Sequence, residues 1–181
     1  WTRSHKERMR RSRIATTRLV VEALPDDRPV TLVSASGIGY YGDRGDAPLT
    51  EQAPPGADFL ARLAADWEEE ALRAAARGAR VVVGRFGVVL DSRGGAMEKM
   101  VPAFRLGLGG PLGNGRQWFP WIHLDDLAAV IEFALGQETM KGCFNVCAPG
   151  VVRQREFARR LGRCLGRPVW LPAPAPMLRL L

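Results

Sequence analysis

Hydrophobic residues along the chain form two kinds of run. Some are short, continuous and rich in valine; in others, apolar positions recur every three or four residues. Continuous apolar runs are typical of strands buried on both faces of a parallel sheet. The pattern predicts one strand at residues 30–33, a second that starts at residue 81 and continues to residue 90, and a shorter one at residues 144–146.

Helical periodicity fills the segments around these strands. Asp58 is placed to cap a helix that Gly78 would end, and Pro25 would end the first helix. The predicted helices are residues 4–24, 59–77, 94–106, 125–136 and 153–165. Alternating helices and strands indicate an α/β protein with a parallel sheet, in which ligands bind outside the carboxyl ends of the strands. We therefore expect a site near residues 34–37 and 86–90.

The stretch after the first strand carries hydroxyl groups on a glycine-rich backbone. A serine such as Ser36 can hydrogen-bond a substrate hydroxyl or carbonyl at the end of a strand. A tyrosine such as Tyr41 can donate a proton to the same oxygen if its pKa is lowered. The alternative is a turn followed by tyrosines of the core, and the residues alone leave both interpretations open.

Two long loops are predicted, at residues 37–57 and 107–117. The second is rich in glycine, but no Gly-Lys-Ser ends it, which excludes a P-loop, and it does not join a strand to a helix as a dinucleotide fingerprint does. We interpret it as a mobile loop over a substrate, with Arg116 available for an anionic group. A solvent-exposed hairpin is the alternative.

Other reactive side chains fit structural roles better. We interpret His123 as a packed histidine that precedes helix-capping aspartates. Asp66 and the glutamates at residues 68–70 occupy nearly consecutive helical positions, so most of them are expected on a solvated face. The cysteines are odd in number and lack a Cys-x-x-Cys pair, so we expect reduced core thiols and no zinc site. They are Cys143, Cys147 and Cys164.

The formal net charge is +7 and the isoelectric point is near 10.1, which raises nucleic-acid binding as a hypothesis. The arginines are scattered along the chain among acidic residues, so we expect no nucleic-acid partner. No apolar run reaches the ~18 residues that a membrane helix needs, and we expect a cytoplasmic protein without a membrane partner. The chain begins at Trp1 and ends in an uncapped apolar run, so we treat it as a fragment.

Several segments together resemble the extended short-chain dehydrogenase/reductase superfamily, the NAD-dependent epimerase/dehydratase group. Residues 34–42 resemble its fifth strand and the turn after it. Residues 85–90 resemble its Arg-x-x-x-Val-x-Gly strand, residues 121–127 its His-Val-x-Asp helix start, and residues 144–146 its Tyr-Asn-Val strand. The resemblance implies a Rossmann-like parallel sheet with a small C-terminal subdomain on the substrate side.

Three longer segments narrow the resemblance to an atypical subgroup with bacterial members, often labelled nucleoside-diphosphate-sugar epimerases, and a mammalian homologue. These segments are residues 58–68, 94–113 and 115–123. The resemblance spans nearly the whole chain. It implies a partial NAD(P)-binding core at residues 1–92, a substrate-side loop and helix at 93–121, a return to the core at 122–148 and a truncated C-terminal subdomain at 149–181.

Two departures from the superfamily pattern bear on the chemistry. Members begin with a strand followed by a Gly-x-x-Gly-x-x-Gly loop that binds the cofactor pyrophosphate, and no predicted strand of these 181 residues leads into such a loop. The chain should therefore hold only the nicotinamide-side half of a cofactor site. The catalytic Tyr-x-x-x-Lys is also absent: neither Tyr40 nor Tyr41 is followed by lysine four positions on, and residues 59–64 of the expected helix contain neither residue type.

The resemblance implies NADP as cofactor, with NAD as the alternative. Arg13 would contact a phosphate or ribose, and a surface salt bridge is its alternative role. The implied residues are Glu7, Arg13, Ser34, Ala35, Phe86, Val88 and Val89 for the cofactor, Arg116 and Gln117 for the substrate, and Ser36 and Tyr41 for catalysis.

The leading hypothesis is an NADP-binding oxidoreductase or epimerase-like protein that acts on an unknown small molecule. The missing Tyr-Lys pair favours the alternative, a non-catalytic nucleotide-sensing or partner-binding module that retains the fold. The sequence leaves open whether the protein is an enzyme, and its oligomeric state.

Overall fold

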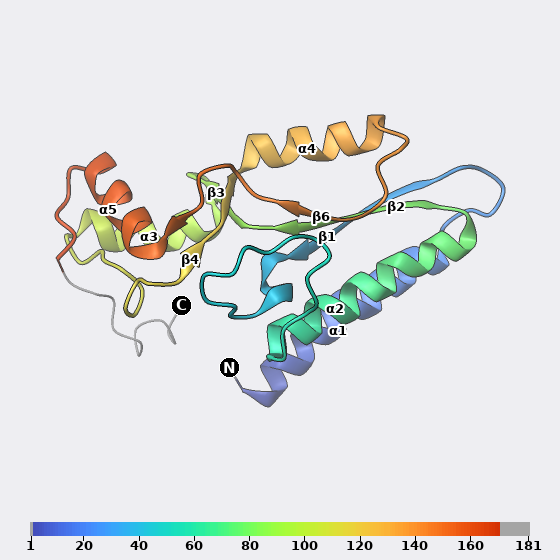
Figure 1. Ribbon diagram of the computed structural model, residues 1–181, viewed down its shortest axis with the longest axis horizontal. Helices are drawn as coiled ribbons and strands as arrows, with labels where there is room; N and C mark the ends of the chain where they lie inside the picture. The colour runs from blue at the N-terminus through green and yellow to red at the C-terminus, as the bar shows by residue number, and fades with distance from the viewer. Residues whose placement is uncertain (1, 171–181) are drawn as a thin grey trace. The chain divides into compact units, whose positions relative to one another are not determined.

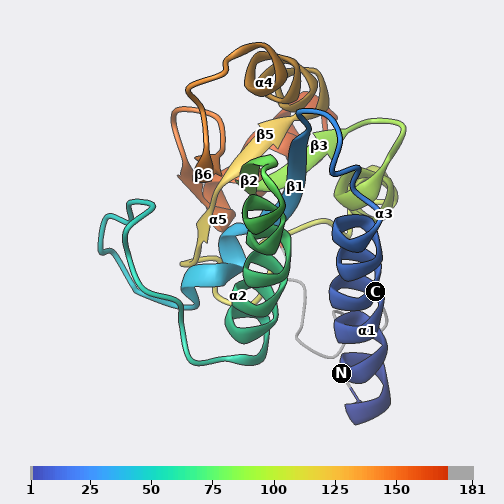
Figure 2. The ribbon, with the colours of Figure 1, turned by 90° about the vertical axis from the view of Figure 1, so that its right-hand side faces the viewer.

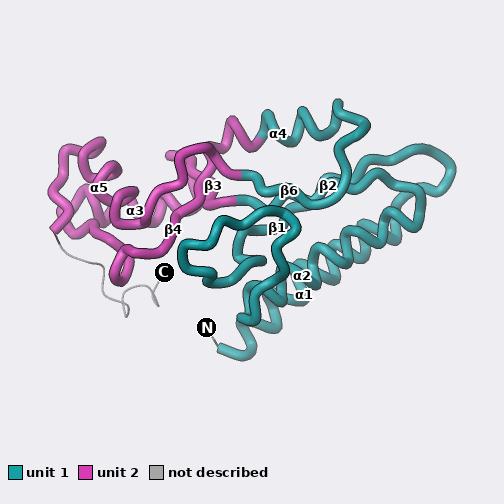
Figure 3. Tube along the Cα trace, viewed as in Figure 1, with its two compact units in different colours: residues 1–86, 128–146 teal, residues 87–127, 147–181 magenta. Residues whose placement is uncertain are grey.

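The computed structural model describes residues 2–170. Trp1, most of the proline-rich tail and the apolar run at residues 178–181 lie outside the described residues. The chain divides into two compact units (Figure 3). The first contains residues 1–86 and 128–146, and the second contains residues 87–127 and 147–181.

The first unit is built on a three-stranded parallel sheet in the order β1-β2-β6. Its strands are β1 (Thr31–Gly37), β2 (Arg80–Phe86) and β6 (Gly142–Val146). The register places Ser36 beside Arg85, and Arg85 beside Asn145. Because the strands are parallel, these three polar residues meet near one edge, where the strands end. The predicted α/β parallel sheet is therefore confirmed.

Helices cover both faces of this sheet. The helices α1 (Arg3–Glu22) and α2 (Phe59–Leu72) lie side by side on one face, and residues 128–136 of α4 (Leu124–Gly136) lie on the other (Figures 1 and 2). Small and branched side chains fill the core between the helix pair and the sheet. They are Val21, Ala71, Ala74, Ala79, Val81 and Val83.

The helix ends follow the predicted signals. The Asp58 carboxylate accepts a hydrogen bond from the Ala61 amide at 2.9 Å, which confirms the predicted cap of α2. After α2 the chain tightens into a 3₁₀ turn, η2 (Arg73–Arg77), and Gly78 ends it with a φ of 79°, a left-handed conformation that favours glycine. A second 3₁₀ turn, η1 (Ile38–Tyr41), follows β1 directly.

The predicted continuous strand over residues 81–90 is wrong. The chain breaks at Gly87, and β3 (Val88–Asp91) pairs with β5 (Trp121–His123) in the second unit instead. A Cβ at Gly87 would lie only 2.9 Å from the carbonyl group of Pro120, whose oxygen accepts a 2.8 Å hydrogen bond from the Val88 amide. The close backbone approach that glycine permits ends β2, although valines continue the apolar run.

The second unit adds a two-stranded antiparallel pair, β4 (Trp118–Phe119) with β7 (Val152–Arg153). Its two helices, α3 (Gly95–Arg105) and α5 (Gln154–Cys164), pack through Phe104, Ala158 and Leu161. Cys164 at the end of α5 is exposed, so the expectation of a core thiol is wrong for this residue.

Candidate functional site

A buried carboxylate lies at the centre of the polar residues near the carboxyl edge of the first unit's sheet. Glu68 of α2 is only 4% exposed and accepts hydrogen bonds from all three strands of the sheet. The Ser36 hydroxyl donates to Oε1 at 2.6 Å, and Arg85 donates to both oxygens, from Nε at 2.9 Å and from Nη2 at 2.8 Å. The Cys143 thiol lies 3.4 Å from Oε2. This fork-to-fork geometry is the strongest form of an arginine–carboxylate pair.

Arg85 links this carboxylate to the aromatic residues after β1. Its Nη1 donates to the Tyr41 hydroxyl at 2.9 Å, and its guanidinium carbon lies 3.5 Å from the centroid of the Tyr40 ring. Burial alone lowers the pKa of the guanidinium, but the hydrogen bonds to Glu68 and Tyr41 outweigh it and raise the pKa above its ordinary value. The arginine is therefore a permanent buried cation, neutralised by Glu68.

The loop at residues 42–57 closes over this edge of the sheet. Tyr41 donates from its hydroxyl to Asn145 Oδ1 at 2.6 Å. The Glu51 carboxylate accepts a hydrogen bond from the backbone N–H of Asn145 at 3.0 Å. The Glu51 backbone carbonyl accepts one from the Arg85 side chain at 3.0 Å. The Asn145 amide holds the pKa of the Glu51 carboxyl below its ordinary value. The predicted loop is thus hydrogen-bonded to both β2 and β6.

Burial raises the pKa of the Cys143 thiol to about 11, and the Glu68 carboxylate beside it acts in the same direction. The thiol is therefore neutral at physiological pH. Since the thiolate is the reactive form of cysteine, Cys143 is a structural neighbour of the carboxylate rather than a nucleophile.

The structure brings the two residues predicted for catalysis together within this network. Ser36 and Tyr41 are 5% and 3% exposed, and each donates its hydroxyl hydrogen to a side chain of the same network, Glu68 and Asn145 respectively. Their catalytic roles stay predictions. Ser34 is buried in β1, while Ala35 of β1 and Phe86 of β2 are partly buried near the same edge.

The remaining predicted residues lie in two other places. Val88 and Val89 belong to β3, and Arg116 and Gln117 to the loop before β4, all in the second unit. The amide of Leu112 in this loop donates to the buried Gln154 side chain of α5 at 2.8 Å. Within the loop, the Gln117 side chain donates to the Leu112 carbonyl at 3.1 Å. Arg116 is exposed.

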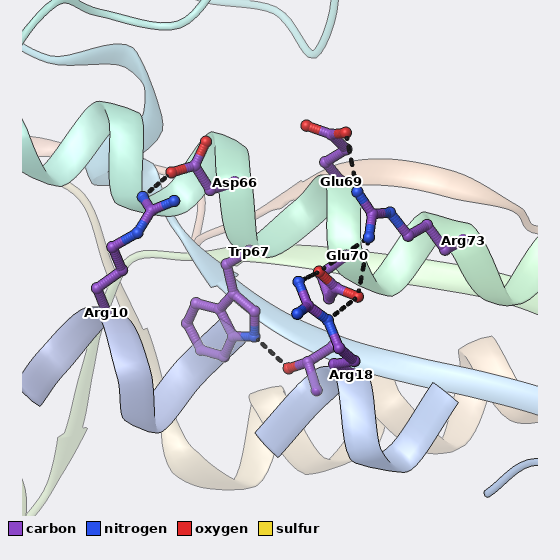
Figure 4. Close-up of polar contacts among 8 residues, drawn as sticks. Arg10, Arg18, Asp66, Trp67, Glu69, Glu70 and Arg73 are labelled. Carbon is purple, nitrogen blue, oxygen red and sulfur yellow. Dashed lines mark hydrogen bonds and ion pairs between the residues drawn. The ribbon is translucent and has the colours of Figure 1, made fainter. Parts of the chain in front are cut away.

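The two helical residues predicted for the cofactor lie on α1. Glu7 is exposed and forms an ion pair with Arg3 at 3.0 Å. Arg13 is partly buried, and its guanidinium carbon lies 5.5 Å from the centroid of the Trp67 ring on α2. Figure 4 shows the surrounding contacts between α1 and α2, in which Arg10 pairs with Asp66.

Two structural interpretations of the sequence need correction. Glu68 and Glu70 are both 4% exposed, so half of the acidic run lies inside the fold and not on a solvated face. Glu70 is paired with Arg18 at 2.8 Å and with Arg73 at 3.3 Å. The His123 side chain is 49% exposed and not packed, and its Nδ1 accepts a hydrogen bond from the Asp125 amide at 3.2 Å.

Sequence reasoning missed Glu68, Arg85 and Asn145 as a connected set. One signal was available: Arg85 interrupts a run of otherwise apolar residues in a predicted buried strand. A buried guanidinium needs a carboxylate partner, so an acidic residue of a neighbouring helix had to turn inward. Which acidic residue does so depends on the packing angle of α2, which the sequence does not contain.

Among residues 2–170 no cluster of His, Cys, Asp or Glu side chains could hold a metal ion. Within the same range no helix has both the length and the apolar character needed to cross a membrane.

The fold and its polar edge define a class of protein, the Rossmann-like α/β proteins. The profile of the NAD dependent epimerase/dehydratase family matches residues 1–147, and the chain belongs to this family. Epimerase family protein SDR39U1 homolog, chloroplastic, from Arabidopsis thaliana is 43% identical over 185 residues, which cover 100% of this chain and 53% of that protein. Epimerase family protein Mb2239 from Mycobacterium bovis is 40% identical, covering 99% of this chain and 60% of its own length.

Solved structures agree with this assignment. Human epimerase family protein SDR39U1 (isoform 2), crystallised with NADPH, has a TM-score of 0.89 and 37% identity, over 99% of this chain and 62% of its own. A nucleoside-diphosphate sugar epimerase from Corynebacterium glutamicum has a TM-score of 0.74 and 36% identity, over 99% of this chain and 40% of its own. The chain thus spans little more than half the length of the curated relatives it matches, between 53% and 60% for the two named above.

Proposed function

We propose that the protein containing this chain binds NADP(H) and acts as an oxidoreductase or epimerase-like enzyme on a small molecule. The observation that carries the proposal is the similarity, over 99% of this chain, to a human relative crystallised with NADPH. The bound cofactor would donate or accept a hydride. The residues of this chain would bind its nicotinamide side and orient the substrate.

The donor set of the first unit fits such a cofactor. Arg13 is a partly buried cation that pairs with no carboxylate among the described residues, so it suits an anionic group of the dinucleotide. Phe86 is the last residue of β2, and Ala35 and Ser34 precede the last residue of β1 by two and three positions, toward the edge at which this class of sheet binds ligands. We extend the proposal to Glu7, Val88 and Val89 for the cofactor and to Arg116 and Gln117 for the substrate.

For the chemical step, we propose that Ser36 binds the reacting oxygen and that Tyr41 donates the proton. Substrate would have to take the place of Asn145 as acceptor for the Tyr41 hydroxyl. Arg85 would then keep the phenol oriented, because it donates to the same oxygen.

A non-catalytic nucleotide-binding module is the second candidate. Two observations favour it. Residues 59–64 lack the Tyr-Lys pair, and the hydroxyl hydrogens of Ser36 and Tyr41 are both donated to partners inside the network. Such a protein would bind NADPH and turn over no substrate.

Two measurements on the whole protein separate the candidates. Calorimetric titration with NADPH tests binding, and no detectable heat at millimolar cofactor would contradict both. A screen of carbonyl compounds and nucleotide sugars for NADPH oxidation, or for epimerised product, tests catalysis. We expect Ser36→Ala and Tyr41→Phe to abolish turnover and Tyr40→Phe to retain it, because Tyr40 contacts Arg85 through its ring. Binding without any turnover would establish the second candidate.

A further inference from the structure

Three arginines of α1 lie along the seam with α2, and they differ in what they meet. Figure 4 shows Arg10 and Arg18 with their carboxylate partners. Arg10 forms an ion pair with Asp66, and Arg18 forms one with Glu70 at 2.8 Å. Arg13, between them, meets no carboxylate among residues 2–170. It meets the face of an aromatic ring instead, with 5.5 Å between its guanidinium carbon and the centroid of Trp67.

The indole ring that faces Arg13 is fixed in its orientation. Trp67 donates from Nε1 to the Thr17 hydroxyl at 2.8 Å. Thr17 follows Arg13 by one helical turn, so both side chains are on the same face of α1. One helix therefore supplies the cation and the hydrogen-bond acceptor, and the other helix supplies the ring that joins them.

The other contacts of Arg13 are weak. Its Nη1 lies 3.4 Å from the Met9 carbonyl and 3.4 Å from the Ser12 hydroxyl, at the long end of hydrogen-bonding distance. An aromatic face attracts a cation but brings no negative charge to neutralise it. Among residues 2–170 the Arg13 guanidinium therefore has no carboxylate to neutralise it, and only its Nη1 has a hydrogen-bond acceptor, a combination that recognises a phosphate group.

We propose that Trp67, held by Thr17, is a positioning residue that presents Arg13 to a phosphate of the bound dinucleotide. This inference rests on the proposed function, because it names residues that act at the same cofactor site. Trp67 does not itself touch the ligand in this arrangement. It fixes the guanidinium that does.

The test is a double-mutant cycle on NADPH affinity, measured by calorimetry in the whole protein. Arg13→Met is expected to weaken NADPH binding by roughly tenfold to hundredfold, the effect of losing a charged hydrogen bond. Trp67→Leu should weaken it by about three- to thirtyfold, the range that cation–π contacts give. In the Arg13→Met background, Trp67→Leu should have no further effect. A purely structural role for Trp67 would weaken binding equally in both backgrounds and would overturn the proposal.

Two milder variants keep the test decisive if Trp67→Leu does not fold. Trp67→Phe retains an aromatic face and should weaken NADPH binding less than Trp67→Leu. Thr17→Val removes the hydrogen bond to the indole and should produce a smaller loss in the same direction. Parent-like NADPH affinity in both Trp67→Phe and Thr17→Val would contradict the proposal.

The matched control is Asp66→Asn. It breaks the ion pair with Arg10 in the same seam without contacting Arg13. We expect unchanged NADPH affinity, and a loss as large as that of Trp67→Leu would mean that general loosening of the seam is responsible. Titration with 2′,5′-ADP and with reduced nicotinamide mononucleotide then identifies the phosphate, because only one fragment should lose affinity in Trp67→Leu. If the parent protein binds no NADPH, the proposed function itself fails. If the parent binds NADPH and Trp67→Leu binds it with the same affinity, only the positioning role of Trp67 fails.

Discussion

Two regions of the first unit join arginine to carboxylate, and burial makes them different. At the sheet edge, the Arg85 and Glu68 side chains are only 4% and 5% exposed and are joined by two parallel hydrogen bonds. In the seam between α1 and α2, the Arg10 and Asp66 side chains are 56% and 37% exposed. Removing one partner of a buried pair is strongly destabilising, because the remaining charge is buried without a partner or solvent. In an exposed pair, water solvates the remaining charge, so the loss of stability is small.

This comparison shows which polar residues specify the structure. The sheet-edge network links α2, all three strands of the sheet and the loop at residues 42–57, so it fixes how these elements fit together. In the seam, the exposed Arg10–Asp66 pair adds little stability, whereas Arg18 pairs with the buried Glu70. Arg13 is the one arginine of the three without a carboxylate among residues 2–170.

The largest effect is expected from Glu68→Gln. It retains the shape of the side chain but leaves the Arg85 charge buried and unpaired, at a cost of about 3–5 kcal/mol in the free energy of unfolding. Urea denaturation measures this change. The double variant Glu68→Leu with Arg85→Met should cost less than the sum of the single changes, because it removes both charges. A cost below ~1 kcal/mol for Glu68→Gln would remove the distinction between the two regions.

The next effect is expected from Tyr41→Phe. It removes a hydroxyl that donates to Asn145 and accepts from Arg85, so about 1–3 kcal/mol of stability should be lost as both partners lose a hydrogen bond. Tyr40→Phe is the control, with an expected change below ~0.5 kcal/mol because only its ring faces Arg85. Equal effects of the two substitutions in urea denaturation would argue against the network.

The contribution of Glu70 to the free energy of unfolding should depend on pH, unlike that of its neighbour Glu69. Glu70 is buried but paired with partly exposed arginines. The hydrogen bond from Arg18 holds the pKa of the Glu70 carboxyl below its ordinary value. The folded pKa is lower than the unfolded one, so the stabilisation is present above the unfolded pKa of ~4.3 and is lost as the pH falls through the folded value. Glu70→Gln should therefore flatten the stability profile in this acidic window. Glu69→Gln, at a side chain that is 72% exposed, should leave the profile unchanged.

The smallest effect is expected from Asp66→Asn in the seam. The pair with Arg10 is exposed, so the change in unfolding free energy should stay below ~1 kcal/mol and shrink further in high salt. Thermal unfolding at low and high ionic strength measures this. A cost as large as that of Glu68→Gln would show that burial is not what separates the two regions.

The helices and the core strands could be predicted from sequence because their signals are local. Asp58 and Gly78 mark the ends of a helical segment through a cap and a left-handed residue, and valine runs mark strands buried on both faces. The break at Gly87 could not be predicted in this way, because it depends on the approach of Pro120, a residue remote in sequence. The same limit applies to Ser36 and Tyr41, whose partners Glu68 and Asn145 come from other elements.

The sequence by itself determined the order of the helices and of the three strands of the first unit's sheet, the parallel α/β class and the family, because periodicity, turn residues and motifs are local features of the chain. It also determined that no Tyr-x-x-x-Lys pair is present in these residues. Only the tertiary structure decided which charges are buried and which residue faces each arginine. The acidic residues of α2 are neighbours in the sequence, and their residue types do not reveal which of them is buried. The packing of α2 against β2 turns Glu68 inward to Arg85. The packing of α2 against α1 places Trp67 beneath Arg13.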